Sequence, residues 1–504
     1  YVIAQFFPRM AVYNDVEGWQ NMQFWGRGEF ALAFGNYDVN ITVPADHVLE
    51  ATGVLLNRKE VFTAEQVKRY ELAEKTFDKP VLIVTPDEAK ATEKGFSDKS
   101  KTWKFRAENV RDFAFSSSRK FIYDAMAVKL ETKNVMAISL YPNESNPLWE
   151  QYSTRAVAQT LKTYSKHTFD YPYHKAISVS AEDQGMEYPM ICWNYGRPDA
   201  NGYVSDRIKY GMISVIIHEV GHNYFPMIVN SDERQWSWMD EGLNTFLEFL
   251  TEQDFMSDYP SSRGPAHKIV PYMSGDQKFL EPIMSNSEGI HQFGANAYAK
   301  PAAGLNILRE TIMGRELFDH AFKTYANRWK FKHPTPEDFF RTMEDASAVD
   351  LDWFWRGWFF STDYVDIGIK EVKQYFVTDE PTAELKDIKT RRGRFGTATG
   401  PYVYLVEGNN PQLNQKNKKD LTISEIKPLN DFVTTKFNAE EQRNLKSPKY
   451  FYEVTFDKPG GMIMPIIVEL QFEDGTSETF KFPEQIWRKS NQSATRVFAT
   501  EKQV

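Results

Sequence analysis

The residues with the clearest chemical potential form an H-E-x-x-H motif at positions 218–222. His218 and His222 are four positions apart, so on a helix their imidazoles share one face and could bind one zinc ion. Glu219 lies beside them, placed to reach a metal-bound water rather than the metal. The short motif also arises by chance, so the alternative is an exposed polar stretch. Apolar flanks favour a metal, because buried histidines and a buried glutamate need a partner.

A catalytic zinc site usually has three protein ligands and an open position for water. Glu241 follows His222 by nineteen residues and opens a second strongly apolar segment. A chain that bends back through residues 229–235 would bring Glu241 to the metal, and we expect it to be the third ligand. The alternative is that Glu241 only stabilises the N-terminus of its helix. Glu248, seven residues further on the same face, could orient one of the histidines.

Two helices must position these residues. Ser205–Phe225 has a helical pattern of apolar residues, with Ser205 as a candidate N-cap and Pro226 as the residue that ends the helix. Trp238–Phe255 has a second helical pattern, whose leucines and phenylalanines would pack against the first helix. The sequence therefore predicts a site between two packed helices.

Further stretches, taken with this motif, resemble one known family. An H-E-x-x-H followed after eighteen residues by a glutamate in a W-x-[ND]-E-G context is similar to the gluzincin aminopeptidases of the aminopeptidase N and leukotriene hydrolase group. Residues 185–189 (GMEYP) resemble the G-x-M-E-N exopeptidase motif of that family, and residues 297–314 resemble its catalytic-tyrosine segment. The sequence departs from the family at Tyr188 and Asp240, where the family usually has asparagine, which leaves the fine specificity open.

The resemblance implies a role for each matching residue. His218, His222 and Glu241 would hold one Zn²⁺. The two catalytic residues would be Glu219, as general base, and Tyr298, as donor to the oxyanion. Glu187 would bind the free α-amino group of a peptide substrate, and Met186 and Gly185 would line the substrate pocket.

The order of strand and helix patterns predicts a multidomain α+β protein. Residues 1–118 alternate as strands do and would form an N-terminal β domain, truncated at its start. Residues 119–362 would form a thermolysin-like, α-rich zinc domain, and residues 363–504 a β-rich C-terminal domain. Because the chain begins within a strand pattern at Tyr1, we expect it to be a fragment or a processed form.

Composition excludes several classes of protein. The chain has 504 residues, a net charge of −9 and a pI near 5.7, which argues against a nucleic-acid binder. Its single cysteine, Cys192, excludes an intramolecular disulfide framework, and we expect a buried thiol there. No stretch approaches eighteen apolar residues, so we expect no transmembrane segment. We favour a periplasmic, secreted or cell-envelope location over the cytoplasm, and the oligomeric state stays open.

The function that fits these observations is removal of amino-terminal residues from peptides by a zinc metallopeptidase. One alternative is a thermolysin-like endopeptidase, which shares the metal chemistry but needs no anchor for an amine. A second alternative is a catalytically inactive scaffold of the same fold that binds partners. Glu187 argues against the endopeptidase, and the complete set of zinc-site residues argues against the scaffold.

Overall fold

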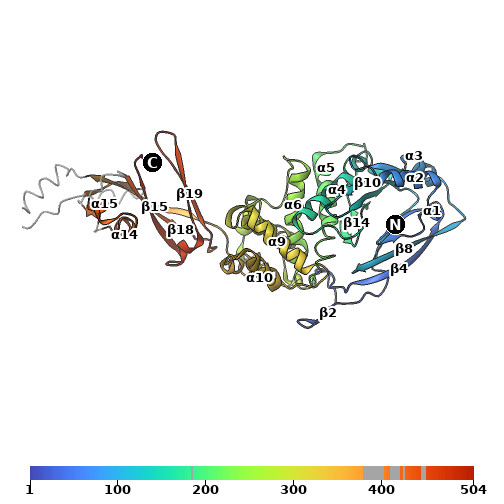
Figure 1. The fold of residues 1–504 in the computed structure, drawn as a ribbon, viewed down its shortest axis with the longest axis horizontal. Coiled ribbons are helices and arrows are strands. Elements are labelled where there is room, and N and C mark those ends of the chain that lie inside the picture. The colour runs from blue at the N-terminus through green and yellow to red at the C-terminus, as the bar shows by residue number, and fades with distance from the viewer. Residues whose placement is uncertain (183–184, 379–401, 409–420, 424–425, 444–449) are drawn as a thin grey trace, which may run out of the picture. The chain divides into compact units, whose positions relative to one another are not determined.

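The structure is a computed structural model, and it describes all residues except 183–184, 379–401, 409–420, 424–425 and 444–449. Contacts within the chain divide it into two compact units, Tyr1–Thr362 and Asp363–Val504 (Figure 1). Mixed helices and sheets are present, as the α+β prediction requires. No helix in the described part of the chain has the length and apolar character needed to cross a membrane.

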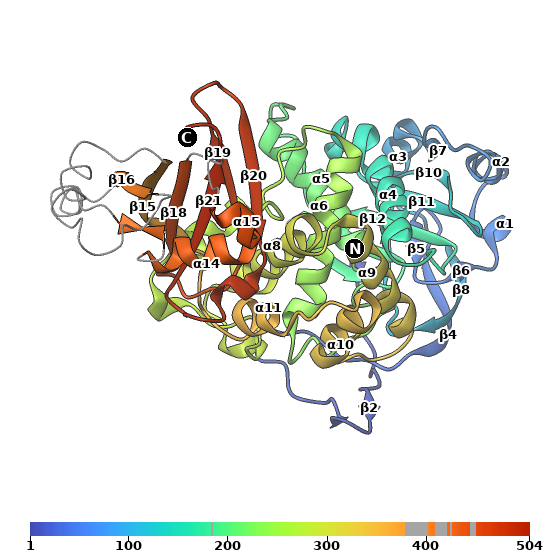
Figure 2. The ribbon, with the colours of Figure 1, turned by 60° about the vertical axis from the view of Figure 1, so that its left-hand side comes forward.

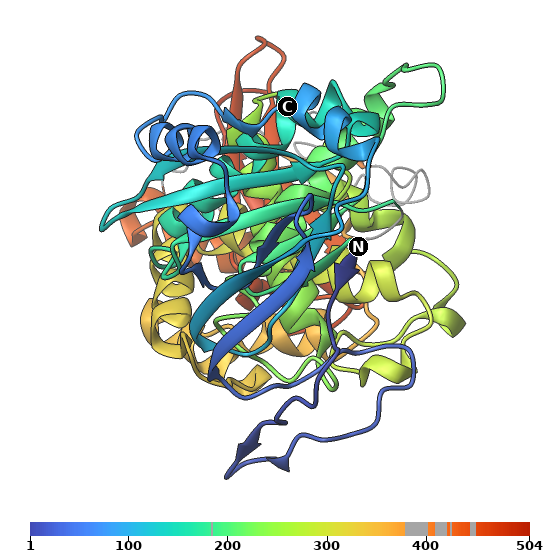
Figure 3. The ribbon, with the colours of Figure 1, turned by 90° about the vertical axis from the view of Figure 1, so that its right-hand side faces the viewer.

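The N-terminal part of the first unit contains two small antiparallel sheets. One has the order β4 (Gly35–Pro44), β8 (Ser100–Val110) and β6 (Val54–Leu55), and the other has the order β1 (Val2–Ile3), β9 (Phe115–Ser118) and β5 (Val48–Ala51). Figure 3 shows the blue N-terminal strands toward the viewer. Exposure alternates along β4, as expected for a strand with one covered face.

Helices interrupt this β region, which the strand pattern did not predict. One of these helices is α3 (Pro86–Glu93), which lies between β7 and β8 in the chain. Thr85 caps that helix, and α2 (Ala64–Ala73) begins with a capping box at Thr63. These threonines satisfy free backbone N–H groups at each helix start, which explains how such short polar helices form.

A six-stranded mixed sheet forms the centre of the first unit. Its strands, in spatial order, are β13 (Met186–Tyr188), β14 (Ile191–Asn194), β12 (Lys175–Ser180), β11 (Asn134–Tyr141), β10 (Ile122–Lys129) and β7 (Val81–Val84). Strands β11, β12 and β14 are parallel, and the other pairs are antiparallel. Because β7 comes from residues before 118, the first two predicted domains share this sheet.

Helices cover the central sheet and carry the predicted site. α4 (Leu148–His167) and α5 (Asp206–Gly221) contact the sheet, and α6 (Leu243–Phe255) packs against both helices (Figures 1 and 2). On its other face, the sheet shares an apolar core with N-terminal residues such as Trp103 and Phe105. Strand β12 has no exposed residue, because both of its faces are covered.

Further helices complete the first unit. A continuous helical stretch runs from Gly294 to Ile312, through α8 (Lys300–Ile307), and is followed by α9 (Arg315–Trp329) and α10 (Pro336–Ser347). Aromatic side chains hold this layer together, since the Trp238 ring lies 5.7 Å from the Phe340 ring and 4.9 Å from the Phe359 ring.

The second unit contains a five-stranded antiparallel sheet. Its strands, in spatial order, are β17 (Leu421–Thr422), β16 (Tyr402–Gly408), β15 (Gly368–Thr378), β18 (Tyr450–Asp457) and β21 (Ser493–Thr500). A separate hairpin joins β19 (Ile466–Gln471) and β20 (Ser477–Phe482). The unit also contains α14 (Lys427–Lys436), which the sequence interpretation missed.

Candidate metal centre and active site

Helix α5 presents the two histidines of the motif on one face. The Ser205 side chain accepts a hydrogen bond from the N–H of Ile208, as expected of an N-cap. The helix ends at Gly221, five residues before Pro226, so the predicted end point is wrong. Tyr164 explains the glycine, because a Cβ at position 221 would lie 2.2 Å from the Tyr164 hydroxyl. His222 keeps helical angles as the C-cap, and the two imidazole rings lie 4.5 Å apart.

Glu241 reaches both histidines from the neighbouring helix. It lies in a π-helical turn, Trp238–Gly242, that runs directly into α6. Its Oε2 atom is 3.0 Å from Nε2 of His218 and 3.2 Å from Nε2 of His222. The π-helical turn packs closely against Pro301, since a Cβ on Gly242 would lie 2.6 Å from the Pro301 ring. The structure therefore brings the three predicted ligands together.

These three residues fit a zinc ion in chemical type and in placement. All three are buried, and their ligand atoms lie within 4.8 Å of one another. The donor set, two imidazole nitrogens and one carboxylate, is one that catalytic zinc sites use. The two nearby carboxylates raise the pKa of His218 to about 10 although burial acts to lower it, so the free centre favours a cation.

The outer nitrogen of each histidine is held away from the centre. Nδ1 of His218 is 2.9 Å from Oε2 of Glu248, the contact expected from the helical spacing. Nδ1 of His222 is 2.9 Å from the carbonyl oxygen of Phe225 and 2.9 Å from Oδ1 of Asp240. Such contacts fix the ring orientation and leave Nε2 for a metal. The contact of Asp240 was missed, although its position beside Glu241 in the sequence was a usable signal.

Glu219 is buried beside the metal centre and has a free oxygen. Its Oε2 atom has no hydrogen-bond partner among the described residues. A Cβ on Gly185 would lie 2.6 Å from Oε1 of Glu219, so only glycine leaves this carboxylate its space. Burial raises the pKa of Glu219 to about 8, against the opposing effect of His218. A carboxyl group with such a pKa can take up and release a proton near neutral pH.

Tyr298 reaches the same centre from the π-helical turn Gly294–Ala299. Its hydroxyl donates to Oε1 of Glu241 at 2.6 Å, and its ring stacks on His218 with 5.6 Å between centroids. The guanidinium carbon of Arg263 lies 4.5 Å from the centroid of the Tyr298 ring. The predicted catalytic tyrosine therefore lies at the metal centre.

Glu187 lies on the edge strand β13 of the central sheet. It is 3% exposed, and its Oε1 atom has no hydrogen-bond partner among the described residues. One of its oxygens lies within 4.8 Å of ligand atoms of His222 and Asp240. Burial raises the pKa of Glu187, because a buried carboxylate loses its hydration.

Glu187 is also part of a carboxylate cluster that the sequence did not reveal. Oxygens of Glu29, Glu187 and Glu233 lie within 4.8 Å of one another, and Arg111 forms an ion pair with Glu233. Glu29 comes from the N-terminal part of the unit and Glu233 from the loop between the two site helices. No local pattern joins these positions, so sequence spacing carried no signal for them.

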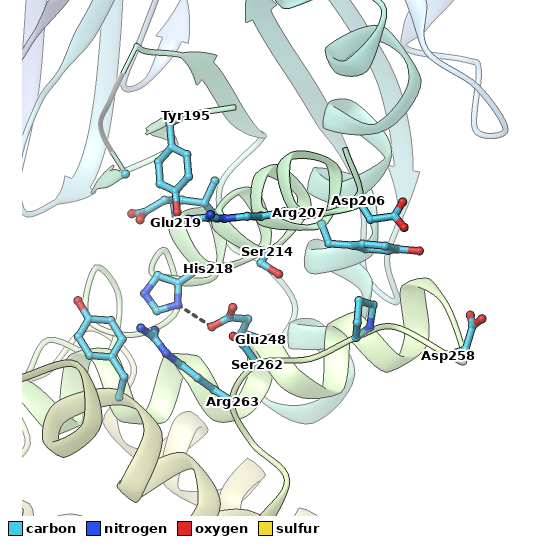
Figure 4. A pocket seen from close by; sticks show the side chains of 16 residues that line it. Tyr195, Asp206, Arg207, Ser214, His218, Glu219, Glu248, Asp258, Ser262 and Arg263 are labelled. Atoms are coloured by element: carbon cyan, nitrogen blue, oxygen red, sulfur yellow. Dashed lines mark hydrogen bonds and ion pairs between the residues drawn. The ribbon is translucent and has the colours of Figure 1, made fainter. Parts of the chain in front are cut away.

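The residues around the predicted substrate pocket differ in placement. A cavity of about 830 Å³ opens beside the metal centre, and its lining includes Gly185, His218, Glu219 and Tyr298 (Figure 4). Met186 is half-buried, packs against the apolar core of the sheet, and is not part of this lining. Its predicted role in substrate binding stays a prediction. Cys192 is fully buried in β14, as expected.

Comparison with known proteins finds a match to one peptidase family. Residues 152–358 match the Peptidase family M1 domain, which confirms the predicted resemblance. "Aminopeptidase 2, mitochondrial" of Saccharomyces cerevisiae is 24% identical over 237 residues, which are 44% of this chain and 25% of the relative. "Endoplasmic reticulum aminopeptidase 1" of Mus musculus is 21% identical over 310 residues, 59% of this chain and 32% of the relative. The match thus spans a third or less of each relative's length.

A solved structure shares the fold over nearly the whole chain. Aminopeptidase A of Legionella pneumophila, solved in complex with aspartic acid, aligns with a TM-score of 0.52 at 12% sequence identity. The alignment covers 98% of this chain and 46% of that one. At this identity the likeness concerns the fold alone.

Proposed function

Because the chain contains a peptidase family M1 domain, we propose that it is a zinc-dependent aminopeptidase that removes amino-terminal residues from peptides. The three-part layout belongs to the same proposal: an N-terminal β region over 1–118 that adds β7 to the central sheet, a thermolysin-like zinc domain over 119–362 and a β-rich domain over 363–504. The boundary after residue 362 coincides with the division between the two compact units.

The metal in this proposal is one Zn²⁺, held by His218, His222 and Glu241. When bound there, it supplies a Lewis acid that polarises the scissile carbonyl and lowers the pKa of a water molecule. Glu248, Phe225 and Asp240 keep the two imidazoles turned toward the centre, so little reorganisation is needed on binding.

Two side chains of this protein then act on the substrate: one transfers a proton, and the other stabilises the negative charge that develops on the carbonyl oxygen. Glu219 accepts the proton of the attacking water at its free Oε2 atom and passes it to the leaving nitrogen. The hydroxyl of Tyr298, which donates to Glu241 in the free protein, turns its proton to the oxygen of the scissile carbonyl as negative charge develops there. Glu219 is buried and Tyr298 is half-buried beside His218, where such interactions are stronger than in water.

The observation that carries the exopeptidase assignment is the unpartnered, buried oxygen of Glu187. Burying a carboxylate oxygen without a hydrogen-bond partner is unfavourable, and a bound ammonium group would compensate by donating a hydrogen bond and a positive charge. The α-amino group of a peptide supplies one positive charge at one end of the chain. Held at Glu187, next to His222, that charge would fix cleavage one residue from the amino terminus.

A panel of chromogenic aminoacyl amides, each with its N-acetylated counterpart, tests this proposal. The zinc-loaded protein should cleave only the substrates with a free amine, lose activity with a chelator and regain it with added zinc. Cleavage of the acetylated substrates would favour the endopeptidase instead. No cleavage by the zinc-loaded protein would contradict the proposal and favour the inactive scaffold.

A further inference from the structure

The cavity beside the metal centre extends away from the amine site. Its lining includes Glu219 and Tyr298 but not Glu187, whose oxygens face His222 and the carboxylate cluster. In the proposed aminopeptidase the substrate amine occupies the Glu187 side and the scissile bond lies at the metal. The peptide beyond the scissile bond must then enter this cavity. At about 830 Å³, the cavity lies in the range that binding pockets for small organic ligands have.

Two arginines line this cavity from different segments. Arg207 is exposed and lies in the first turn of α5, and Arg263 is half-buried in the loop that follows α6. Neither forms an ion pair with an acidic side chain among the described residues. Other arginines of this unit are paired, for example Arg309 with Asp319 and Arg119 with Asp46. Two arginines on one cavity wall that have no acidic partner in the described part of the chain therefore need an explanation.

The acids that line the cavity do not neutralise this pair. Glu248 is bound to His218, and Glu219 belongs to the metal centre. In Figure 4 the carboxylates of Asp206 and Asp258 lie on the side away from His218, whereas Arg263 lies beside His218. The figure also shows Arg207 extending back along α5 toward Tyr195 and Glu219. In this view both guanidinium groups lie on the His218 side of the cavity, away from the carboxylates of Asp206 and Asp258.

We propose that Arg207 and Arg263 bind a carboxylate of the substrate on the leaving-group side of the scissile bond, an inference that rests on the proposed aminopeptidase function. A guanidinium presents several N–H donors in a planar fork that matches a carboxylate, which makes arginine a selective partner. The carboxylate is either the free C-terminus of a short peptide or an acidic side chain just after the cleaved bond. Arg263 is held over the Tyr298 ring, so little freedom is lost when it binds.

The test compares matched pairs of peptides that differ in one carboxylate. The N-terminal residue is the one the aminoacyl amide panel prefers. The first pair is Xaa-Ala-Ala as the free acid and as the C-terminal amide, and the second is Xaa-Asp-Ala-amide and Xaa-Asn-Ala-amide. We expect the carboxylate member of at least one pair to have a kcat/KM about tenfold higher at low salt, mainly through KM. The advantage should shrink as salt screens the exposed charge.

Variants assign the effect to the two arginines. Arg207→Gln and Arg263→Gln should each reduce the acid-to-amide ratio several-fold, whereas Arg106→Gln, on the exposed face of β8, should leave it unchanged. Titration calorimetry of the same peptides with the zinc-loaded Glu219→Gln protein gives a readout without turnover. The first pair responds to a bound C-terminus and the second pair to a bound acidic side chain.

The outcomes distinguish failure of the carboxylate site from failure of the aminopeptidase assignment. Ratios within twofold in both pairs, or ratios that both arginine variants leave unchanged, overturn the carboxylate site while the aminopeptidase stands. Absence of cleavage of every peptide overturns the aminopeptidase, and the carboxylate site with it.

Discussion

The metal centre and the carboxylate cluster around Glu187 lie next to each other but are built differently. At the metal centre each ligand has a second contact, with His218 held by Glu248, His222 by Phe225 and Glu241 by Tyr298. In the cluster one oxygen of Glu187 and one of Glu233 have no hydrogen-bond partner among the described residues. A site whose ligands are all held by second contacts suits a resident metal ion. Carboxylates without partners suit a substrate group that binds and leaves in each turnover.

The charge balance of the two regions follows the same division. Burial and neighbouring carboxylates raise the pKa of Glu29 and Glu187, and they raise the pKa of Glu233 to about 7 against the effect of Arg111. Glu241 behaves in the opposite way, since both histidines lower its pKa despite its burial. The cluster therefore carries like charges that an arriving ammonium group would relieve.

The largest expected effect comes from a substitution at the metal centre, where every ligand has a second contact. Glu241→Gln replaces the only negatively charged ligand of the three with a neutral amide, so we expect loss of bound zinc and of nearly all activity. Metal content by atomic spectroscopy and hydrolysis of a free-amine substrate measure the two effects. Glu316→Gln, at an exposed position of α9, is the matched control and should retain both. Full zinc content in Glu241→Gln would contradict the assignment of the third ligand.

Glu219→Gln separates the proton carrier from the metal ligands. The amide has nearly the same shape but cannot accept the proton, so kcat should fall about 10²–10⁴-fold. Zinc content should stay at one per chain, because Glu219 is not among the grouped ligand atoms. Near-normal turnover in this variant with zinc bound would rule out the assigned role.

Glu187→Gln tests the carboxylate cluster, where Glu187 has an oxygen without a hydrogen-bond partner among the described residues. Removing the buried charge should lower kcat/KM for free-amine substrates about 100-fold, as for breaking one partner of a buried ion pair. The preference for free over N-acetylated substrates should collapse, while zinc content stays unchanged. Glu316→Gln again serves as the control. A preserved preference would show that the amine is bound elsewhere.

The difference between the two regions also decides what could be predicted from the sequence. The metal ligands lie within 24 residues, from His218 to Glu241, on two helices whose apolar periodicity is plain, so spacing alone places them together. Glu29, Glu187 and Glu233 meet only because a sheet edge, a loop and the N-terminal part converge, and only Glu187 belongs to a motif. The two site helices were predicted from their apolar periodicity, although the first ends at Gly221 and not at Phe225. The short capped helices α2 and α3 were missed, since side-chain caps rather than apolar faces define them.

Glu29→Gln should have the smallest effect and sharpens the comparison most. If the cluster is a receptor for an ammonium group, removing one of its three carboxylates weakens binding but leaves the main anchor, so KM should rise a few-fold with kcat nearly unchanged. The same change removes repulsion between like charges in the free protein, so the midpoint of thermal unfolding should rise. Steady-state kinetics and thermal unfolding without substrate measure the two effects. A fall in both stability and kcat would instead make Glu29 a structural member of the unit, because a residue that only binds substrate has no reason to stabilise the free protein.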